Sequence, residues 1–189
     1  MYSHFNRCLS CYCGALVSPM SKKRLTDNTQ VGTNRLLIIA CSKRKIAIGA
    51  DKMVEAKELY DGVVYRSINK WIRDNPDNKL KILILSANYG LIRWDEYVHP
   101  YNIRMNKNIA KQVKLQVSQA LSLHSSTTIS DIYIELGQDY IDCLPDLSCY
   151  YPKASISYGS GRIGHRLHNL IVWLNKGAEL KGDDDVDNL

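Results

Sequence analysis

The chain has 189 residues, a hydrophobic content of 45% and a formal net charge of +6. This length can bury one good hydrophobic core, so we expect a single domain rather than a multidomain protein. The longest apolar runs, at 36–40 and 82–85, fall far short of the roughly 20 residues that cross a bilayer. We therefore expect a soluble protein with no membrane contact.

The charge is distributed unevenly along the chain. The last eight residues hold four aspartates, so the rest of the chain carries a formal charge of +10. A basic globular body attracts polyanions, of which nucleic acid is the commonest, although an excess of lysine can also serve solubility alone. Charge by itself leaves both interpretations open.

The cysteines do not predict a metal centre. Cys8, Cys11 and Cys13 have a spacing that suits part of a metal site, but no nearby histidine or second cysteine pair completes four ligands. We expect no metal and no cofactor. The first 19 residues lack the apolar stretch of a secretory signal, which predicts a reducing, cytoplasmic setting with free thiols.

Four apolar runs predict buried strands, at 36–40, 82–85, 132–136 and 154–158. The first two do not alternate polar and apolar residues, which favours a parallel sheet covered on both faces. A long loop is expected after the second strand.

Three segments have helical periodicity: Val63–Asp74, Asn108–Leu123, and a last helix that ends at Gly177 as its C′ glycine. The alternation of strands and helices predicts a three-layer α/β sandwich whose mostly parallel central sheet has about four strands. We expect this domain to span residues 35–176 as a monomer. A flexible extension (1–34) is expected before it and an acidic disordered tail (177–189) after it.

In such folds ligands bind beyond the carboxyl ends of the strands. All four predicted strands lead into polar, turn-rich segments: 41–45 (CSKRK), 86–90 (SANYG), 137–140 (GQDY) and 159–165 (GSGRIGH). This convergence is the main sequence evidence for a functional site.

The first strand ends in Ser42, Lys43 and Lys45, a hydroxyl and two amines that suit a phosphate. A solvated basic loop is the simpler alternative, and the glycine pattern of a nucleotide triphosphate loop is absent. After the second strand come Ser86, Asn88 and Tyr89.

The following loop, 92–105, interleaves aromatic and cationic side chains, among them Tyr101 and Arg104, with Asn102 between them. Aromatic rings can stack on bases while cations meet phosphates. The same loop could instead simply cover the core.

The last two strand ends supply a carboxylate and possible donors to an anion. Gln138 and Asp139 follow the third strand, where an aspartate near a helix start is more often an N-terminal cap. Arg162 and His165 stand at the start of the last helix, within a turn whose glycines at 159, 161 and 164 let backbone approach a ligand closely. An ordinary strand-to-helix turn would look the same.

Over residues 35–176 the sequence resembles an uncharacterised bacterial and phage domain family. The resemblance rests on the segments CSKRK, AKELYDGVVYRSI, ILSANYGLIRWDEYVHPYNIRM, LGQDY and GSGRIGHRLHNLIVWL. The middle block is also similar to the YaaA peroxide-stress proteins, and that similarity implies DNA binding. The chain departs from the family pattern at Asn88, where lysine is usual, and at Asn102, where aspartate is usual, so a nucleophilic lysine at position 88 is excluded.

The strand order is also compatible with the uracil-DNA glycosylase superfamily. That resemblance implies a base pocket built from the loop after the first strand, an asparagine after the second and a histidine loop after the last. On this mapping CSKRK, Asn88 and the turn 159–165 take the three positions.

These features lead to the hypothesis of a DNA glycosylase that removes a modified base from double-stranded DNA, leaving an abasic site. Defence against modified phage genomes is a plausible setting. Cleavage of an N-glycosidic bond develops positive charge on the sugar and negative charge on the base.

The hypothesis assigns a role to each candidate residue. Asn88 would orient water or read the base, Asp139 would face the sugar cation, and His165 or Arg162 would donate to the departing base. Tyr89 or Tyr101 would stack on the flipped base, while Lys43 and Lys45 hold flanking phosphates or one of them forms a Schiff base. The remaining candidate binding residues are Ser42, Ser86, Asn102, Arg104 and Gln138. The alternatives are a DNA-binding stress protein of the YaaA kind and a deazaguanine-type base-exchange enzyme.

Overall fold

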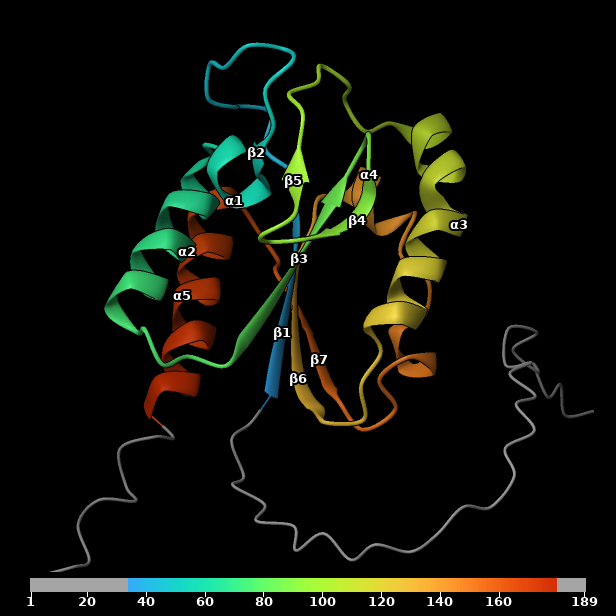
Figure 1. Ribbon diagram of the computed structural model, residues 1–189. Coiled ribbons are helices and arrows are strands. Elements are labelled where there is room, and N and C mark those ends of the chain that lie inside the picture. Colours follow the sequence, from blue (N-terminus) through green and yellow to red (C-terminus); the bar gives the residue numbers. More distant parts are fainter. Residues whose placement is uncertain (1–33, 180–189) are drawn as a thin grey trace, which may run out of the picture. The chain divides into compact units, whose positions relative to one another are not determined.

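The computed structural model describes residues 34–179, with side chains through residue 176, as a three-layer α/β domain (Figure 1). The strands are β1 (Asn34–Ala40), β2 (Val54–Glu55), β3 (Leu80–Ser86), β4 (Gly90–Arg93), β5 (Tyr97–Val98), β6 (Ile129–Glu135) and β7 (Ser155–Tyr158). The helices are α1 (Ala56–Leu59), α2 (Val63–Asp74), α3 (Lys107–His124), α4 (Gln138–Ile141), the 3-10 turn η1 (Leu147–Cys149) and α5 (Ile163–Glu179).

The central sheet has the strand order β4-β3-β1-β6-β7. Four strands are parallel, and the edge strand β4 is antiparallel to β3. The first strand of the sheet, β1, lies at its centre. The chain next forms β3 and β4 on one side of β1, and then β6 and β7 on its other side. The direction of winding therefore reverses between β1 and β6, and the carboxyl ends of these two strands are where open α/β sheets bind ligands.

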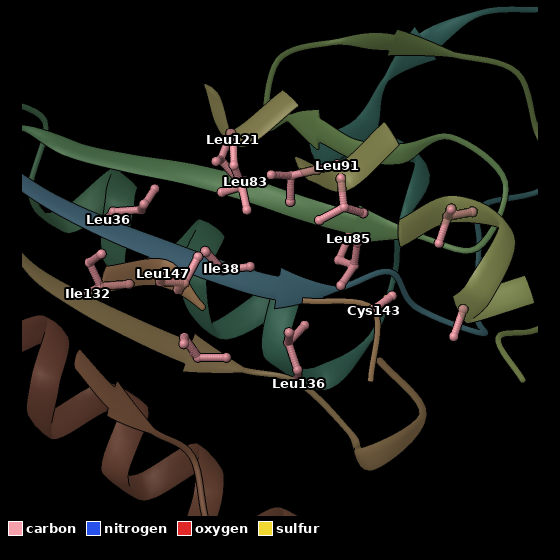
Figure 2. Close-up of a cluster of buried hydrophobic side chains, with 14 of the residues drawn as sticks. Leu36, Ile38, Leu83, Leu85, Leu91, Leu121, Ile132, Leu136, Cys143 and Leu147 are labelled. Carbon is pink, nitrogen blue, oxygen red and sulfur yellow. The ribbon is translucent and has the colours of Figure 1, made fainter. Parts of the chain in front are cut away.

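Each face of the sheet packs on its own hydrophobic cluster. Figure 2 shows the cluster under α3, where Leu36 and Ile38 of β1 meet Leu121. The opposite face is covered by α2 and α5, which bury Tyr65, Ile68, Trp71, Leu170, Trp173 and Leu174 against the other side of the same strands. Each fully buried large apolar side chain contributes roughly 1.5–3 kcal/mol, so both layers are needed to hold the strands in place.

The mostly parallel α/β architecture is confirmed, and the bounds of α2 agree with its prediction. The estimate of about four strands is wrong, because the segment after β3 is not simply a loop. Ala87, Asn88 and Tyr89 form a tight turn, and Gly90, with a φ of 69°, brings the chain back as β4. Three-residue hairpins with a left-handed glycine have this geometry.

A second correction concerns the last helix. Gly177 does not end α5, which continues through Glu179. A glycine inside a helix costs roughly 1 kcal/mol relative to alanine, which the packing of the preceding turns can offset.

Residues 1–33 and 180–189 lie outside the described part of the chain. They include most of the expected N-terminal extension and acidic tail, together with Cys8, Cys11 and Cys13. Among the helices of residues 34–179, none is long and apolar enough to cross a membrane.

Candidate functional site

Three polar side chains form a row across the carboxyl ends of adjacent strands. Ser86 ends β3, Cys41 follows β1, and Glu135 ends β6. Strand pairing places Ala40 beside Leu85 and Ile39 beside Glu135. Because side chains alternate along a strand, all three members of the row belong to the face covered by α2 and α5. The row spans the point where the winding of the sheet reverses.

Ser86 is fully buried and holds the hairpin turn together. The backbone amides of Asn88 and Tyr89 each donate to its Oγ at 3.2 Å, and the Tyr101 hydroxyl lies 2.8 Å from the same oxygen. Because Ser86 Oγ already accepts two amide protons, its own proton is directed to Tyr101. This serine therefore connects the turn to the loop before α3.

Four tyrosines surround the row, and we call Tyr60, Tyr65, Tyr101 and Tyr140 the tyrosine cluster. The hydroxyls of Tyr60 and Tyr101 lie 2.9 Å apart, and the Tyr140 hydroxyl lies 3.2 Å from Cys41 Sγ. Tyr65 donates to the Ala40 carbonyl at 3.0 Å. Burial raises the pKa of Tyr60 to about 12 and raises the pKa values of the other three as well. At neutral pH these hydroxyls are therefore uncharged and able to donate protons.

Lys45 reaches into the tyrosine cluster. Its Nζ lies 4.3 Å from the centroid of the Tyr101 ring and 5.7 Å from that of Tyr60, and it donates to the Ser42 carbonyl at 3.3 Å. Burial lowers the pKa of the Lys45 amine, while Cys41 opposes this effect in part. Within residues 34–176, Lys45 forms no ion pair with a carboxylate.

Glu135 is a buried carboxylate at the other end of the row. Its side chain is 4% exposed, and its Oε1 pairs with Arg166 of α5 at 2.6 Å. Its Oε2 has no hydrogen-bond partner among the described residues. Burial raises the pKa of Glu135, and Arg166 opposes the rise. The pair lies beside the reversal point of the sheet, with one carboxylate oxygen unused.

The unpartnered oxygen of Glu135 belongs to a wider group. In the described part of the chain, the buried side-chain polar atoms without a partner are on Tyr133, Glu135, Arg166 and Trp173. The rings of Tyr133 and Trp173 are 5.3 Å apart, and Tyr133 and Glu135 point to the same face of β6. Buried polar groups are normally satisfied, so this concentration favours a site that takes a polar ligand or water.

Gly159 makes room for the Glu135 carboxylate. A Cβ at position 159 would lie 2.0 Å from Glu135 Oε2 and 3.4 Å from the Tyr133 hydroxyl. The glycine-rich turn thus allows a close approach, but the group that approaches is Glu135 of the same chain. Gly161 has a φ of 87°, which favours glycine.

Sequence-predicted residues that come together are Ser42, Lys45, Ser86 and Tyr101. Ser42 accepts from the Arg44 amide at 3.2 Å, and a Cβ at Gly62 would lie 2.7 Å from its hydroxyl. The first-strand loop is therefore packed tightly against the start of α2. This group lies around the polar row, as the strand-end argument predicts.

Most of the remaining predicted residues point to solvent and make no hydrogen bond to a member of the row. The exposed ones are Lys43, Asn88, Asn102, Arg104, Gln138, Asp139, Arg162 and His165. Asn88 is at the tip of the β3–β4 turn, and Asp139 is in the first turn of α4. Gln138 contacts Asp142 at 3.4 Å.

One predicted binding residue, Tyr89, and one predicted catalytic residue, His165, are engaged within the fold. The Tyr89 hydroxyl bonds to the carbonyl and amide of His99, at 3.1 and 3.2 Å, and so ties down the loop. His165 Nδ1 lies 3.3 Å from the Ser160 carbonyl and 3.2 Å from the Asn169 amide. Both contacts support local backbone or helix structure.

Sequence reasoning missed Glu135, Arg166, Tyr60, Tyr140 and Cys41 as members of the site. The available signal for Glu135 was a charged residue at the end of the otherwise apolar strand IYIEL. Tyr60 and Tyr140 stand in the quoted segments AKELYDGVVYRSI and GQDY, but no pattern there singles out either tyrosine. No group of three or more His, Cys, Asp or Glu residues that could hold a metal ion is present in the described region.

A groove of about 580 Å³ adjoins the tyrosine cluster. It runs beside α2 from Tyr60 to Asn78, with Trp94 among its apolar lining residues and Arg66 and Arg73 among its cations. Arg66 pairs with Asp61 at 2.7 Å, whereas Arg73 forms no ion pair within residues 34–176. The groove touches the tyrosine cluster at Tyr60, and its lining holds the acidic residues Glu58 and Asp61 beside the cations.

No curated protein matches this sequence. The model of a family of unknown function, DUF6884, matches residues 36–172, a span that contains every member of the polar row and the tyrosine cluster. The chain belongs to this uncharacterised family.

Proposed function

We propose that this protein cleaves the N-glycosidic bond of a modified base in double-stranded DNA and leaves an abasic site. The observation that carries the proposal is Glu135, a buried carboxylate with one unpartnered oxygen at the reversal point of the sheet. Carboxylates at such positions can stabilise the cationic sugar that forms as the base departs. In this proposal Glu135 takes the role that sequence reasoning gave to Asp139.

The reaction develops positive charge on the sugar and negative charge on the base, and the two ends of the polar row offer groups that can stabilise each charge. Glu135 supplies the negative side, and Arg166 fixes its Oε1 so that Oε2 is left for the sugar. The tyrosine cluster supplies neutral hydroxyl donors for the negative charge that develops on the base. Such preorganised groups are the largest source of catalysis in many enzymes.

The burial of Glu135 sets a condition on substrate entry. Since Oε2 is covered and Gly159 lies against it, the turn at 159–162 must move before a sugar can reach the carboxylate. Enzymes that act on bases in duplex DNA extrude the nucleotide from the stack. We expect a flipped nucleotide to displace this turn.

DNA as the substrate is supported by charge. The chain without its final eight residues carries +10, and the exposed Lys43 and Arg162 lie on the loops after β1 and β7. Cations beside a strand-end site would hold the phosphates that flank the flipped nucleotide. The sequence resemblance to uracil-DNA glycosylases supports a role for the same two loops. The sequence resemblance to a bacterial and phage domain family favours a hypermodified phage base and a role in antiviral defence.

Base exchange is the second candidate, and the burial of Glu135 favours it. A carboxylate shielded from water can hold the sugar until a second base or amine attacks, whereas hydrolysis needs an ordered water. The two reactions share the first step and differ in the acceptor.

The test uses DNA from phages that carry different modified bases, with unmodified DNA as the control. We expect base release and alkali-labile sites from at least one modified DNA, and at least a 100-fold loss in Glu135→Gln. Asp139→Asn is the matched comparison, because it changes the carboxylate that the sequence first indicated. Incorporation of an isotope-labelled free base would identify exchange. Salt-sensitive DNA binding with no released base from any substrate would leave the binding-only, YaaA-like function.

A further inference from the structure

We propose that Lys45 gives this protein an abasic-site lyase activity, in which its amine forms a Schiff base with the C1′ aldehyde of a ring-opened abasic sugar. The inference rests on the proposed function, because that sugar is the product of base removal. Of the two lysines after β1 that the sequence left open for a Schiff base, it assigns the covalent role to Lys45.

The position of Lys45 is fixed by backbone and side-chain contacts. Its backbone forms a β-bridge with Tyr60, so the start of its side chain is anchored to the tyrosine cluster. Its Nζ is held between aromatic rings, 4.3 Å from the centroid of Tyr101, and by the Ser42 carbonyl at 3.3 Å. A lysine on a solvated loop would have none of these restraints.

Its surroundings differ from those of neighbouring lysines. Lys43 is exposed, and Lys57 pairs with Glu55 at 2.6 Å. Lys45 is partly buried and has no carboxylate partner in residues 34–176. Burial among apolar groups favours the neutral amine, and only the neutral amine is nucleophilic.

The chemistry balances without a co-reactant. The Lys45 nitrogen attacks C1′ of the aldehyde, a C–N bond forms, and the carbonyl oxygen leaves as water to give the imine. Solvent water then takes a C2′ proton, the electron pair left at C2′ forms a C2′–C3′ double bond, and the C3′–O bond breaks, so that the 3′ phosphate departs and the strand is nicked. The hydroxyls of Tyr60 and Tyr101, 2.9 Å apart beside the amine, are placed to donate the proton that water formation requires.

The experiment incubates the full-length protein with a duplex oligonucleotide that carries one preformed abasic site, in the presence of sodium borohydride. Borohydride reduces an imine to a stable secondary amine, so we expect a protein–DNA adduct on a denaturing gel and a nicked strand without the reductant. Peptide mass spectrometry should place the adduct on Lys45. Lys45→Arg should lower trapping at least 50-fold, while Lys70→Arg, on the exposed side of α2, should not change it.

Mapping of the wild-type adduct keeps the proposal falsifiable even if Lys45→Arg folds poorly. An adduct on Lys43, on another lysine or on the N-terminal amine overturns it, as does the absence of any adduct. The preformed site makes the two proposals separable. Base release without trapping overturns the lyase role alone, and trapping on Lys45 without base release from any DNA overturns the glycosylase role alone.

Discussion

Gly159 lies directly against Glu135, and a Cβ at position 159 would stand only 2.0 Å from the carboxylate oxygen Oε2. Gly159 directly follows the last parallel strand, β7, and its missing side chain allows a buried carboxylate to lie at the end of the neighbouring strand β6. In sequence, the two residues are 24 positions apart, and neither identifies the other.

Gly159→Ala should disturb the carboxylate more than the fold. Because Glu135 must move away or the turn must shift, we expect base release to fall at least tenfold and stability to fall by about 1–3 kcal/mol, as for overpacked sites. Activity assays and urea unfolding measure the two effects.

Gly164→Ala is the matched control. A Cβ at position 164 would meet nothing within 4 Å, and the position lies in α5. Alanine there should retain activity and stabilise the protein by about 0.5–1 kcal/mol through helix propensity. Equal loss of activity in both variants would contradict a specific role for Gly159.

The raised pKa of Glu135 predicts how stability depends on pH. The folded protein holds this proton more tightly than the unfolded chain, so burial of the carboxylate costs increasing stability as the pH rises from the unfolded pKa toward the folded pKa. Glu135→Gln removes this titration. Its unfolding free energy should therefore improve relative to that of the unsubstituted protein as the pH rises from about 4.5.

Asp146 provides a control of opposite sign. Hydrogen bonds from Ser148 lower the pKa of Asp146, so its contribution is present above the unfolded pKa and lost as the pH falls. The unfolding free energy of Asp146→Asn should therefore fall relative to that of the unsubstituted protein as the pH rises. Urea unfolding between pH 4 and 7 tests both variants. If the unfolding free energies of Glu135→Gln and of the unsubstituted protein change in parallel with pH, the raised pKa of Glu135 is refuted.

Much of the fold could be predicted from hydrophobic patterning. The apolar runs in β1, β3 and β6 are continuous because both faces of the sheet are covered. The bounds predicted for α2 from its apolar stripe agree with the structure at both ends. β4 escaped prediction because it is short and depends on the left-handed conformation of Gly90. Its residues become a strand only by pairing with β3 across the hairpin.

The sequence indicated the edge of the sheet where polar groups gather more clearly than it indicated the individual residues of the candidate site. Strand ends indicated where polar groups gather, and the structure brings Lys45 and Tyr101 close to Ser86 of the row. Glu135 was overlooked because in sequence it is one more strand residue. Its significance depends on the β1–β6 pairing and on Arg166, which lies 31 positions later.

Ser86→Ala should destabilise the hairpin. The substitution leaves two part-buried amides and the Tyr101 hydroxyl without their shared partner, so we expect a loss of about 1–3 kcal/mol in the free energy of unfolding. Ser122→Ala is a suitable control, because that exposed hydroxyl bonds only to the carbonyl one helical turn earlier. A loss of similar size in both variants would count against the role of Ser86.

Asn88→Ala tests whether the tip of the turn takes part in chemistry. Its side chain is exposed and makes no hydrogen bond within the described residues, so we expect stability to change by less than about 0.5 kcal/mol. If Glu135 carries the reaction, single-turnover base release should stay within threefold of the unsubstituted protein. A 100-fold loss with DNA binding intact would instead restore Asn88 as the residue that orients water or reads the base.

Lys43→Ala should weaken DNA binding without affecting chemistry once DNA is bound. Lys43 is exposed on the loop after β1, where it can meet a phosphate flanking the polar row. Removing one phosphate contact lowers the slope of log K against log salt by about 1. Titrations from 50 to 200 mM salt measure the slope, with Lys111→Ala on the exposed side of α3 as the control. Equal slopes for Lys43→Ala and the unsubstituted protein would place the DNA path elsewhere, with the groove beside α2 and its Arg73 as the next region to test.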